Sequence, residues 1–141
     1  MKRIVVRNLQ RAIRVGVPAL QRSAEKALRL CLKVRGKRAT KLAELEEIHV
    51  WLVSNRRMSI LHRKFLHQPG PTDVITFEHG EIFISAEMAK RNAKRFGTSL
   101  ARELQLYVIH GLLHLHGFDD GAPKAALEMK WTQEKVLASL N

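Results

Sequence analysis

The sequence has little that supports disulfide, membrane or secretory functions. Its single cysteine, Cys31, cannot form an internal disulfide and lies in the apolar stretch LRLCLKV, which favours a buried small hydrophobic side chain. No segment approaches the roughly 18 consecutive apolar residues of a membrane span. The N-terminal stretch MKRIVVRNLQRAIRV lacks the apolar core and cleavage site of a secretory signal. We therefore expect a cytoplasmic protein without membrane contact, folded as a single domain over residues 1–141.

Acidic residues are also scarce, because 13 Asp and Glu stand against 25 Lys and Arg and give a formal net charge of +12. Such an excess favours polyanionic partners, since basic side chains that neutralise phosphates release condensed counterions. The basic residues are spread over 3–38, 56–64 and 90–95 and do not form one amphipathic surface helix, which favours nucleic acid over an anionic membrane. The alternative is that these residues only keep the domain soluble.

The periodicity of apolar residues predicts alternating strands and helices. Strands are expected at 2–9, 46–54, 72–77 and 81–85, and helices at 18–34, 56–66, 86–96, 99–116 and 124–140. The last two strands are close enough to form an antiparallel hairpin. The predicted fold class is α/β (α+β), with a small mixed β-sheet of about four strands packed with five or six helices.

Local signals set the expected limits of these helices. Pro18 is suited to the first turn of a helix, and Ser85 can cap the helix at 86–96. Gly36 and Gly97 are suited to helix ends. Within the helix at 56–66 we expect three apolar side chains to point inward, those of Met58, Leu61 and Phe65.

The stretch HGLLHLHGFDD, residues 110–120, predicts a metal site at the end of a central helix. Residues four apart on a helix lie one above the other, so His110 and His114 present two imidazoles to one ion. Gly117 can end the helix in a left-handed conformation and turn the chain back toward the pair. Asp120 is the expected third ligand, and Asp119 is the alternative. This spacing matches that of the long zinc motif of metzincins.

Residues in and around this motif indicate what kind of site it forms. A lone His-x3-His pair is more often two partly buried polar residues, but the glycine and the acid at these offsets favour a metal. His116 points away from the pair by helical geometry and is expected to be a surface residue or an indirect neighbour of the site. The H-E-x-x-H protease motif places a glutamate base after the first histidine, and Gly111 stands there, which disfavours a peptidase.

At these residues the chain resembles the YbeY-type rRNA maturation endoribonucleases, whose hallmark is H-G-x-L-H-L-x-G-Y-D-H. The family also carries P-T-D-V-L-S-F and G-D-I-x-I-S strands, and this chain has PTDVITF at 71–77 and GEIFIS at 80–85. Met129 matches a methionine common in the last helix of the family. The resemblance covers about the last ninety residues well, and the N-terminal third only in its pattern.

The resemblance implies a zinc-dependent, single-strand-specific endoribonuclease with one Zn²⁺ per chain, held by His110, His114 and Asp120. It implies a role in 16S rRNA 3′-end maturation and ribosome quality control, with single-stranded RNA or rRNA and small ribosomal subunit proteins as partners. We expect a monomer or a weak dimer. Asp120 replaces the third histidine of the family, and a carboxylate also binds zinc well.

A second departure concerns catalysis, because the family carries Tyr-Arg at the positions of Phe65 and Leu66. A leucine cannot hold a phosphate, so we expect Arg63, one helical turn away, to supply the catalytic cation. The basic residues Arg56, Arg57 and Lys64 are the expected RNA-binding residues. The alternatives are an RNA-binding protein with a structural metal and no turnover, and a zinc hydrolase, such as a peptidase, with another substrate.

Overall fold

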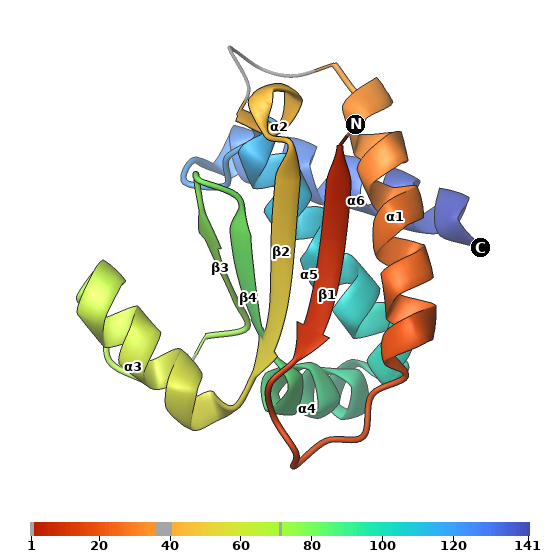
Figure 1. The fold of residues 1–141 in the computed structure, drawn as a ribbon. Coiled ribbons are helices and arrows are strands. Elements are labelled where there is room, and N and C mark those ends of the chain that lie inside the picture. The colour runs from red at the N-terminus through yellow and green to blue at the C-terminus, as the bar shows by residue number, and fades with distance from the viewer. Residues whose placement is uncertain (1, 36–40, 71) are drawn as a thin grey trace.

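The computed structural model describes residues 2–35, 41–70 and 72–141, and Figure 1 shows a four-stranded sheet with helices behind it. The strands are β1 (Arg3–Asn8), β2 (Glu47–Val53), β3 (Val74–Phe77) and β4 (Glu81–Ser85), and their order in the sheet is β1-β2-β4-β3. Strands β1, β2 and β4 run parallel, whereas β3 runs antiparallel to β4. The predicted mixed sheet and its hairpin are thus confirmed.

Six helices form in the described part of the chain. They are α1 (Val17–Lys33), α2 (Lys41–Glu44), α3 (Asn55–Leu66), α4 (Ala86–Phe96), α5 (Leu100–Leu115) and α6 (Pro123–Leu140). Five of them match the predicted helices to within one or two residues, and α2 is too short for periodicity to reveal. Gly36, the predicted end of α1, lies outside the described residues, and α1 ends at Lys33. Among the described residues, no helix is long and apolar enough to cross a membrane.

The main core lies between α5 and one face of the sheet. Strand side chains alternate between faces, so Ile48 and Ile82 point toward the helices and are fully buried. Helix α5 brings its own buried face, including Leu112, against them. A Cβ atom on Gly111 would lie 2.8 Å from two side-chain carbons of Ile82, so the glycine permits a close approach of α5 to β4. Cys31 is buried in this core as predicted.

Two side-chain predictions are wrong. Phe65 is 50 % exposed instead of pointing inward, because only Met58 and Leu61 of the predicted trio pack on the small second core cluster under α3. Of the two positions expected for His116, the one on the surface is wrong, because the residue is buried and its Nε2 contacts the carbonyl oxygen of Val34 at 2.5 Å. In both cases the contact that decides the side-chain position comes from another segment of the chain. For His116 it is Val34, after α1, and for Phe65 it is Phe77 of β3.

Candidate metal centre

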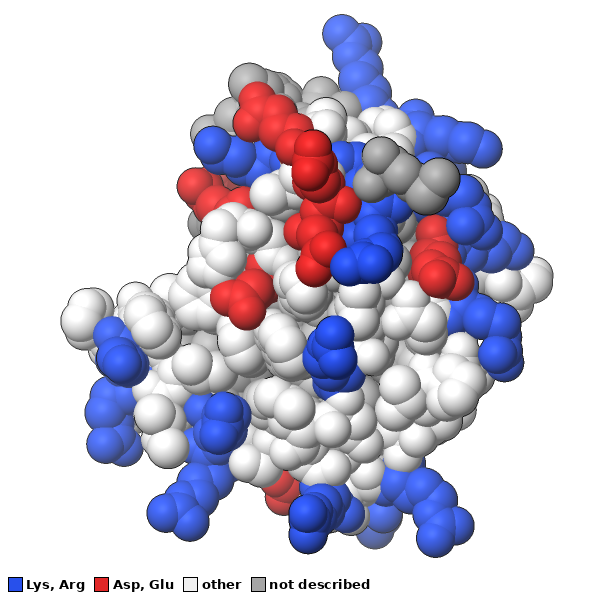
Figure 2. All heavy atoms as spheres, in the orientation of Figure 1, with Lys and Arg blue, Asp and Glu red and all other residues white. Residues whose placement is uncertain are grey.

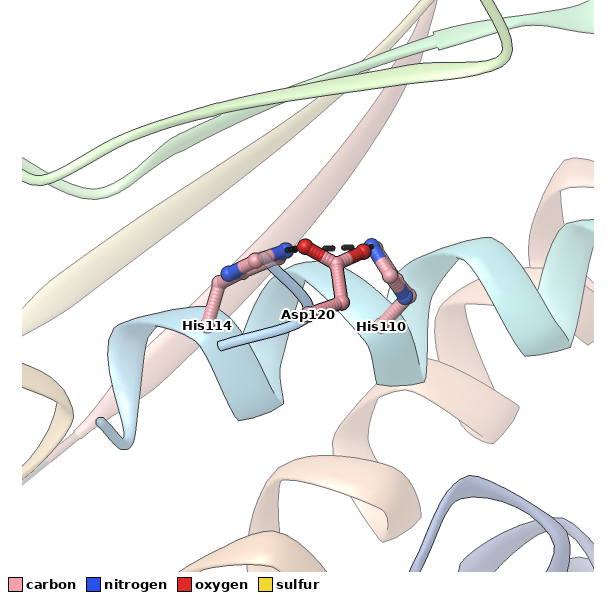
Figure 3. A group of neighbouring side chains, drawn as sticks. All are labelled: His110, His114 and Asp120. Carbon is pink, nitrogen blue, oxygen red and sulfur yellow. Dashed lines mark hydrogen bonds and ion pairs between the residues drawn. The ribbon is translucent and has the colours of Figure 1, made fainter. Parts of the chain in front are cut away.

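Helix α5 ends at a glycine turn, as the sequence predicts. Gly117 takes a positive φ of 95°, the left-handed region that favours glycine. The Phe118 N–H then donates to the Leu113 carbonyl at 2.9 Å, and the helix closes on itself. The chain reverses over the last turn of the helix, and this reversal carries Asp120 back over the exposed side of α5 (Figure 3).

His110, His114 and Asp120 converge as the sequence predicts (Figure 3). The Nε2 atoms of the two histidines lie 3.1 Å apart. The Asp120 carboxylate places one oxygen 3.6 Å from Nε2 of His110 and the other 3.8 Å from Nε2 of His114. The alternative ligand, Asp119, is otherwise engaged, because its Oδ1 accepts a hydrogen bond from the Gly121 N–H at 2.6 Å.

These separations fit a single transition-metal ion. A tetrahedral zinc ion with bonds of about 2.0–2.1 Å keeps its ligand atoms about 3.3 Å apart. The two Nε2 atoms, 3.1 Å apart, lie close to that value, and each carboxylate oxygen of Asp120 is slightly farther than that from one histidine, at 3.6 Å for His110 and 3.8 Å for His114. Two imidazole nitrogens and one carboxylate oxygen also form a donor set that zinc accepts, with a fourth position left for water or substrate. The donor chemistry and the geometry therefore agree.

Both imidazoles are held from behind, so that their Nε2 atoms face each other. Nδ1 of His110 donates a hydrogen bond to the side-chain oxygen of Gln133, which comes from α6. This bond fixes the tautomer with a free lone pair on Nε2. Burial lowers the pKa of His114, and His110 lowers it further, while Asp120 and a backbone hydrogen bond at Phe118 oppose them. The neutral form that binds metal is thus favoured.

A cavity of about 240 Å³ adjoins the group. Its described lining includes His110, Asp120 and Gln133, together with Asp73 at the start of β3 and Tyr107 on α5. Burial raises the pKa of Tyr107 to about 12, and its hydroxyl accepts a hydrogen bond from Asn92 at 2.6 Å. Gln133 and Tyr107 were missed in the sequence. Tyr107 lies one helical turn before His110, so helical spacing could have placed it beside the site. No sequence signal links Gln133 to His110.

Asp73 has the local role that its position suggests. One of its carboxylate oxygens accepts a hydrogen bond from the Val74 N–H at 2.8 Å and lies 3.5 Å from the Thr72 hydroxyl. Strand β3 consequently starts at Val74, two residues later than predicted.

The predicted RNA-binding and catalytic cations lie on another element. Arg56, Arg57, Arg63 and Lys64 are all exposed on α3. This helix packs over Val53 and Ile75, on the sheet face opposite α5. Neither these four residues nor Leu66 belongs to the described lining of the cavity beside His110. Leu66, at the family's arginine position, is 47 % exposed. The catalytic role of Arg63 stays a prediction.

The fold and the site define a class: a small α+β protein with a His-His-Asp group, suited to hold a metal ion, on one central helix and the turn that follows it. Comparison with known proteins gives the family. The model of the family described as "Endoribonuclease YbeY" matches residues 5–141. The chain belongs to the YbeY family and is accordingly an enzyme, a nuclease of the hydrolase class.

Individual relatives agree with this assignment. The "Endoribonuclease YbeY" of Thermobifida fusca is 32 % identical over 140 residues, 87 % of this chain and 87 % of the relative. That of Frankia alni is 34 % identical over 72 % of this chain and 67 % of its own length. The solution structure of TM1509 from Thermotoga maritima is 29 % identical, with a TM-score of 0.67 over 97 % of this chain and 88 % of that one.

Proposed function

We propose that this protein is a zinc-dependent, single-strand-specific endoribonuclease that acts in 16S rRNA 3′-end maturation and ribosome quality control. The observation that carries the proposal is the convergence of His110, His114 and Asp120 within 4.8 Å of one another in a chain of the YbeY family. The family membership supports the endoribonuclease reaction. The donor set supports the metal, and two imidazoles with a carboxylate hold the catalytic zinc ion of known hydrolases.

When bound, a zinc ion supplies Lewis acidity that polarises a phosphoryl oxygen and makes water more acidic. The residues of the chain have separate tasks. Gln133 orients His110, and the turn at Gly117 keeps Asp120 in place. The exposed cations Arg56, Arg57 and Lys64 neutralise phosphates of the RNA, which agrees with the net charge of +12. Arg63 is the candidate for a cation that acts in the transition state.

The family assignment opposes the alternative of an RNA-binding protein with a structural metal and no turnover. Leu66 favours it, because this side chain cannot contact a phosphate as the family's arginine does. A peptidase is further disfavoured by packing. Gly111 lies so close to Ile82 that a glutamate base at this position has no room unless α5 moves away from the sheet.

We further propose cytoplasmic residence, with rRNA and small ribosomal subunit proteins as partners and a monomer or weak dimer as the assembly. The support is the basic surface and the relation to the YbeY family.

The decisive experiment is cleavage of a defined single-stranded RNA by zinc-loaded protein, beside His114→Ala purified in parallel. We expect zinc-dependent cleavage by the wild type and none by the variant. The neighbouring aspartates give a matched pair, because Asp120→Asn should lose zinc and activity while Asp119→Asn keeps both. Equal cleavage by the wild type and His114→Ala would assign the activity to a contaminant and remove the enzymatic proposal.

A further inference from the structure

One face of the sheet is left largely open. Figure 1 views this face, with β1, β2 and β4 in front of α5 and α6. Among the helices of the described residues, only α3 packs on it, toward the β3 side, where Met58 covers Val53 and Ile75. The remainder of the face is formed by strand residues whose neighbours in sequence point into the main core.

A continuous row of aromatic rings crosses the open face. We call it the aromatic row, and it consists of His49, Trp51, Phe83, Phe77 and Phe65. From His49 at one end, successive ring centroids lie 5.5, 6.4, 5.7 and 5.3 Å apart. The first four rings come from three neighbouring strands and are partly exposed, and the last comes from α3 and is half exposed. Contiguous aromatic surface of this kind marks an interaction site, because the exposed parts of these rings gain stability when a partner covers them.

The charges beside the aromatic row are mostly positive at the α3 end. No acidic residue occurs between Glu47 and Asp73, whereas α3 alone carries Arg56, Arg57, Arg63 and Lys64. Figure 2 shows basic side chains over α3 beside a largely uncharged surface, and most of the visible acidic side chains lie toward the opposite end, where basic side chains also occur.

Two of the carboxylates toward that opposite end have partners. Glu47 contacts Arg3 at 2.7 Å, and Glu81 accepts a hydrogen bond from the Trp51 indole at 2.9 Å. The hydrogen bond from His79 keeps the pKa of Glu81 below its usual range.

We propose that the aromatic row is a stacking platform for the bases of single-stranded RNA, with Arg56, Arg57 and Lys64 of α3 holding the adjoining phosphates. The inference rests on the proposed function, since it names where that RNA lies beyond the metal centre. Unpaired bases stack on aromatic rings with little regard to sequence, and sheets with exposed aromatic side chains are well suited to this task. A duplex keeps its base faces covered and gains nothing from the rings.

The edge strand β3 connects the platform to the metal centre. Its Phe77 lies in the aromatic row, and its Val74 lines the cavity beside His110 on the other side of the sheet. Because β3 is the outermost strand, an RNA strand has only this edge to cross between the two sites. The platform thus selects single strands and positions the nucleotides that flank the cleaved bond.

Two phenylalanines offer a matched test. Phe65 and Phe96 each lie in the last turn of a helix and are at least half exposed, and each has the preceding cation over its ring, Lys64 at 5.5 Å and Arg95 at 5.4 Å. Phe96 lies on α4, outside the aromatic row. The affinity of metal-free protein for a labelled single-stranded 12-mer is measured by fluorescence anisotropy. Loss of one stacked base corresponds to a roughly fivefold to 150-fold higher Kd.

We expect Phe65→Ala to weaken binding within that range, Phe65→Tyr to restore it, and Phe96→Ala to change Kd less than twofold. In a Trp131→Phe background, which leaves Trp51 as the only tryptophan, the single strand should quench fluorescence and the same sequence as a duplex should not. Circular dichroism of each variant confirms that the fold is intact.

Equal affinities for Phe65→Ala and Phe96→Ala, or equal binding of single strand and duplex, would overturn the platform. RNA binding would then rest on the basic side chains and the phosphates alone. If these results accompany normal zinc-dependent cleavage by the wild type, the proposed function stands without the platform. A wild-type protein that neither binds nor cleaves single-stranded RNA would overturn both.

Discussion

The hydrogen bond between His110 and Gln133 makes a sharp prediction about metal affinity. Gln133 is partly buried on α6, and its side-chain oxygen accepts the proton of His110 Nδ1. Gln133→Leu keeps a similar volume but removes the acceptor. The imidazole then loses the group that fixes its tautomer and its ring orientation, and the Nδ1 proton is left without this partner.

The size of the effect follows from what this partner does. Outer partners of metal-binding histidines typically contribute 10- to 100-fold in metal affinity, about 1.4–2.7 kcal/mol. Gln133→Leu should therefore weaken zinc binding within that range. Gln133→Glu should keep or increase the affinity, because a carboxylate is a stronger acceptor for the same proton.

The assay is a competition titration of zinc between the protein and a chromophoric chelator. Gln105→Leu is the matched control, because this glutamine is also partly buried on a helix and its side chain donates to the Ser23 hydroxyl at 3.0 Å. Its zinc affinity should equal that of the wild type. A Gln133→Leu affinity within twofold of both would refute the argument that α6 holds the site in its binding geometry.

Three further predictions concern packing, catalysis and pH. Gly111→Ala should lower the free energy of unfolding, because its Cβ would clash with Ile82. In urea titrations, a double-mutant cycle with Ile82→Val should show a coupling energy of at least about 0.5 kcal/mol. Additive effects would contradict the close contact. Arg63→Ala should lower the single-turnover cleavage rate at least about tenfold with little change in RNA affinity, and Leu66→Arg should partly restore it; wild-type rates in both variants would show that the cation comes from elsewhere. Burial lowers the pKa of His114 below 6.5, so the unfolded chain binds more protons at this residue than the folded chain does. The free energy of unfolding of the metal-free protein should therefore fall as the pH drops through about 6.5. His114→Gln should reduce the dependence of this free energy on pH between about pH 7.5 and 5.5, and an unchanged dependence would contradict the argument.

Much of the metal centre could be predicted because it is local in the sequence. Its three ligands lie within residues 110–120, where helical spacing aligns His110 with His114 and a single left-handed glycine returns Asp120 to them. The helix limits were equally local. Ser85 caps α4 through the Met88 N–H, and Gly97 ends the same helix at a φ of 67°.

The surroundings of the site depend on contacts that no local pattern encodes. Gln133 reaches His110 only because α6 packs along α5, and Asp73 joins their cavity because β3 pairs with β4. The inward prediction for Phe65 failed because helical periodicity cannot tell which apolar side chains a neighbouring element will cover.

The open face of the sheet shows the same division. Alternation along each strand decided that Trp51, Phe77 and Phe83 point away from the main core. Only the strand order β1-β2-β4-β3 brought them side by side, and only the packing of α3 left them partly exposed beside its cations. Backbone conformation is set within a few residues, whereas the neighbours of a side chain are set by pairing between segments far apart in the chain.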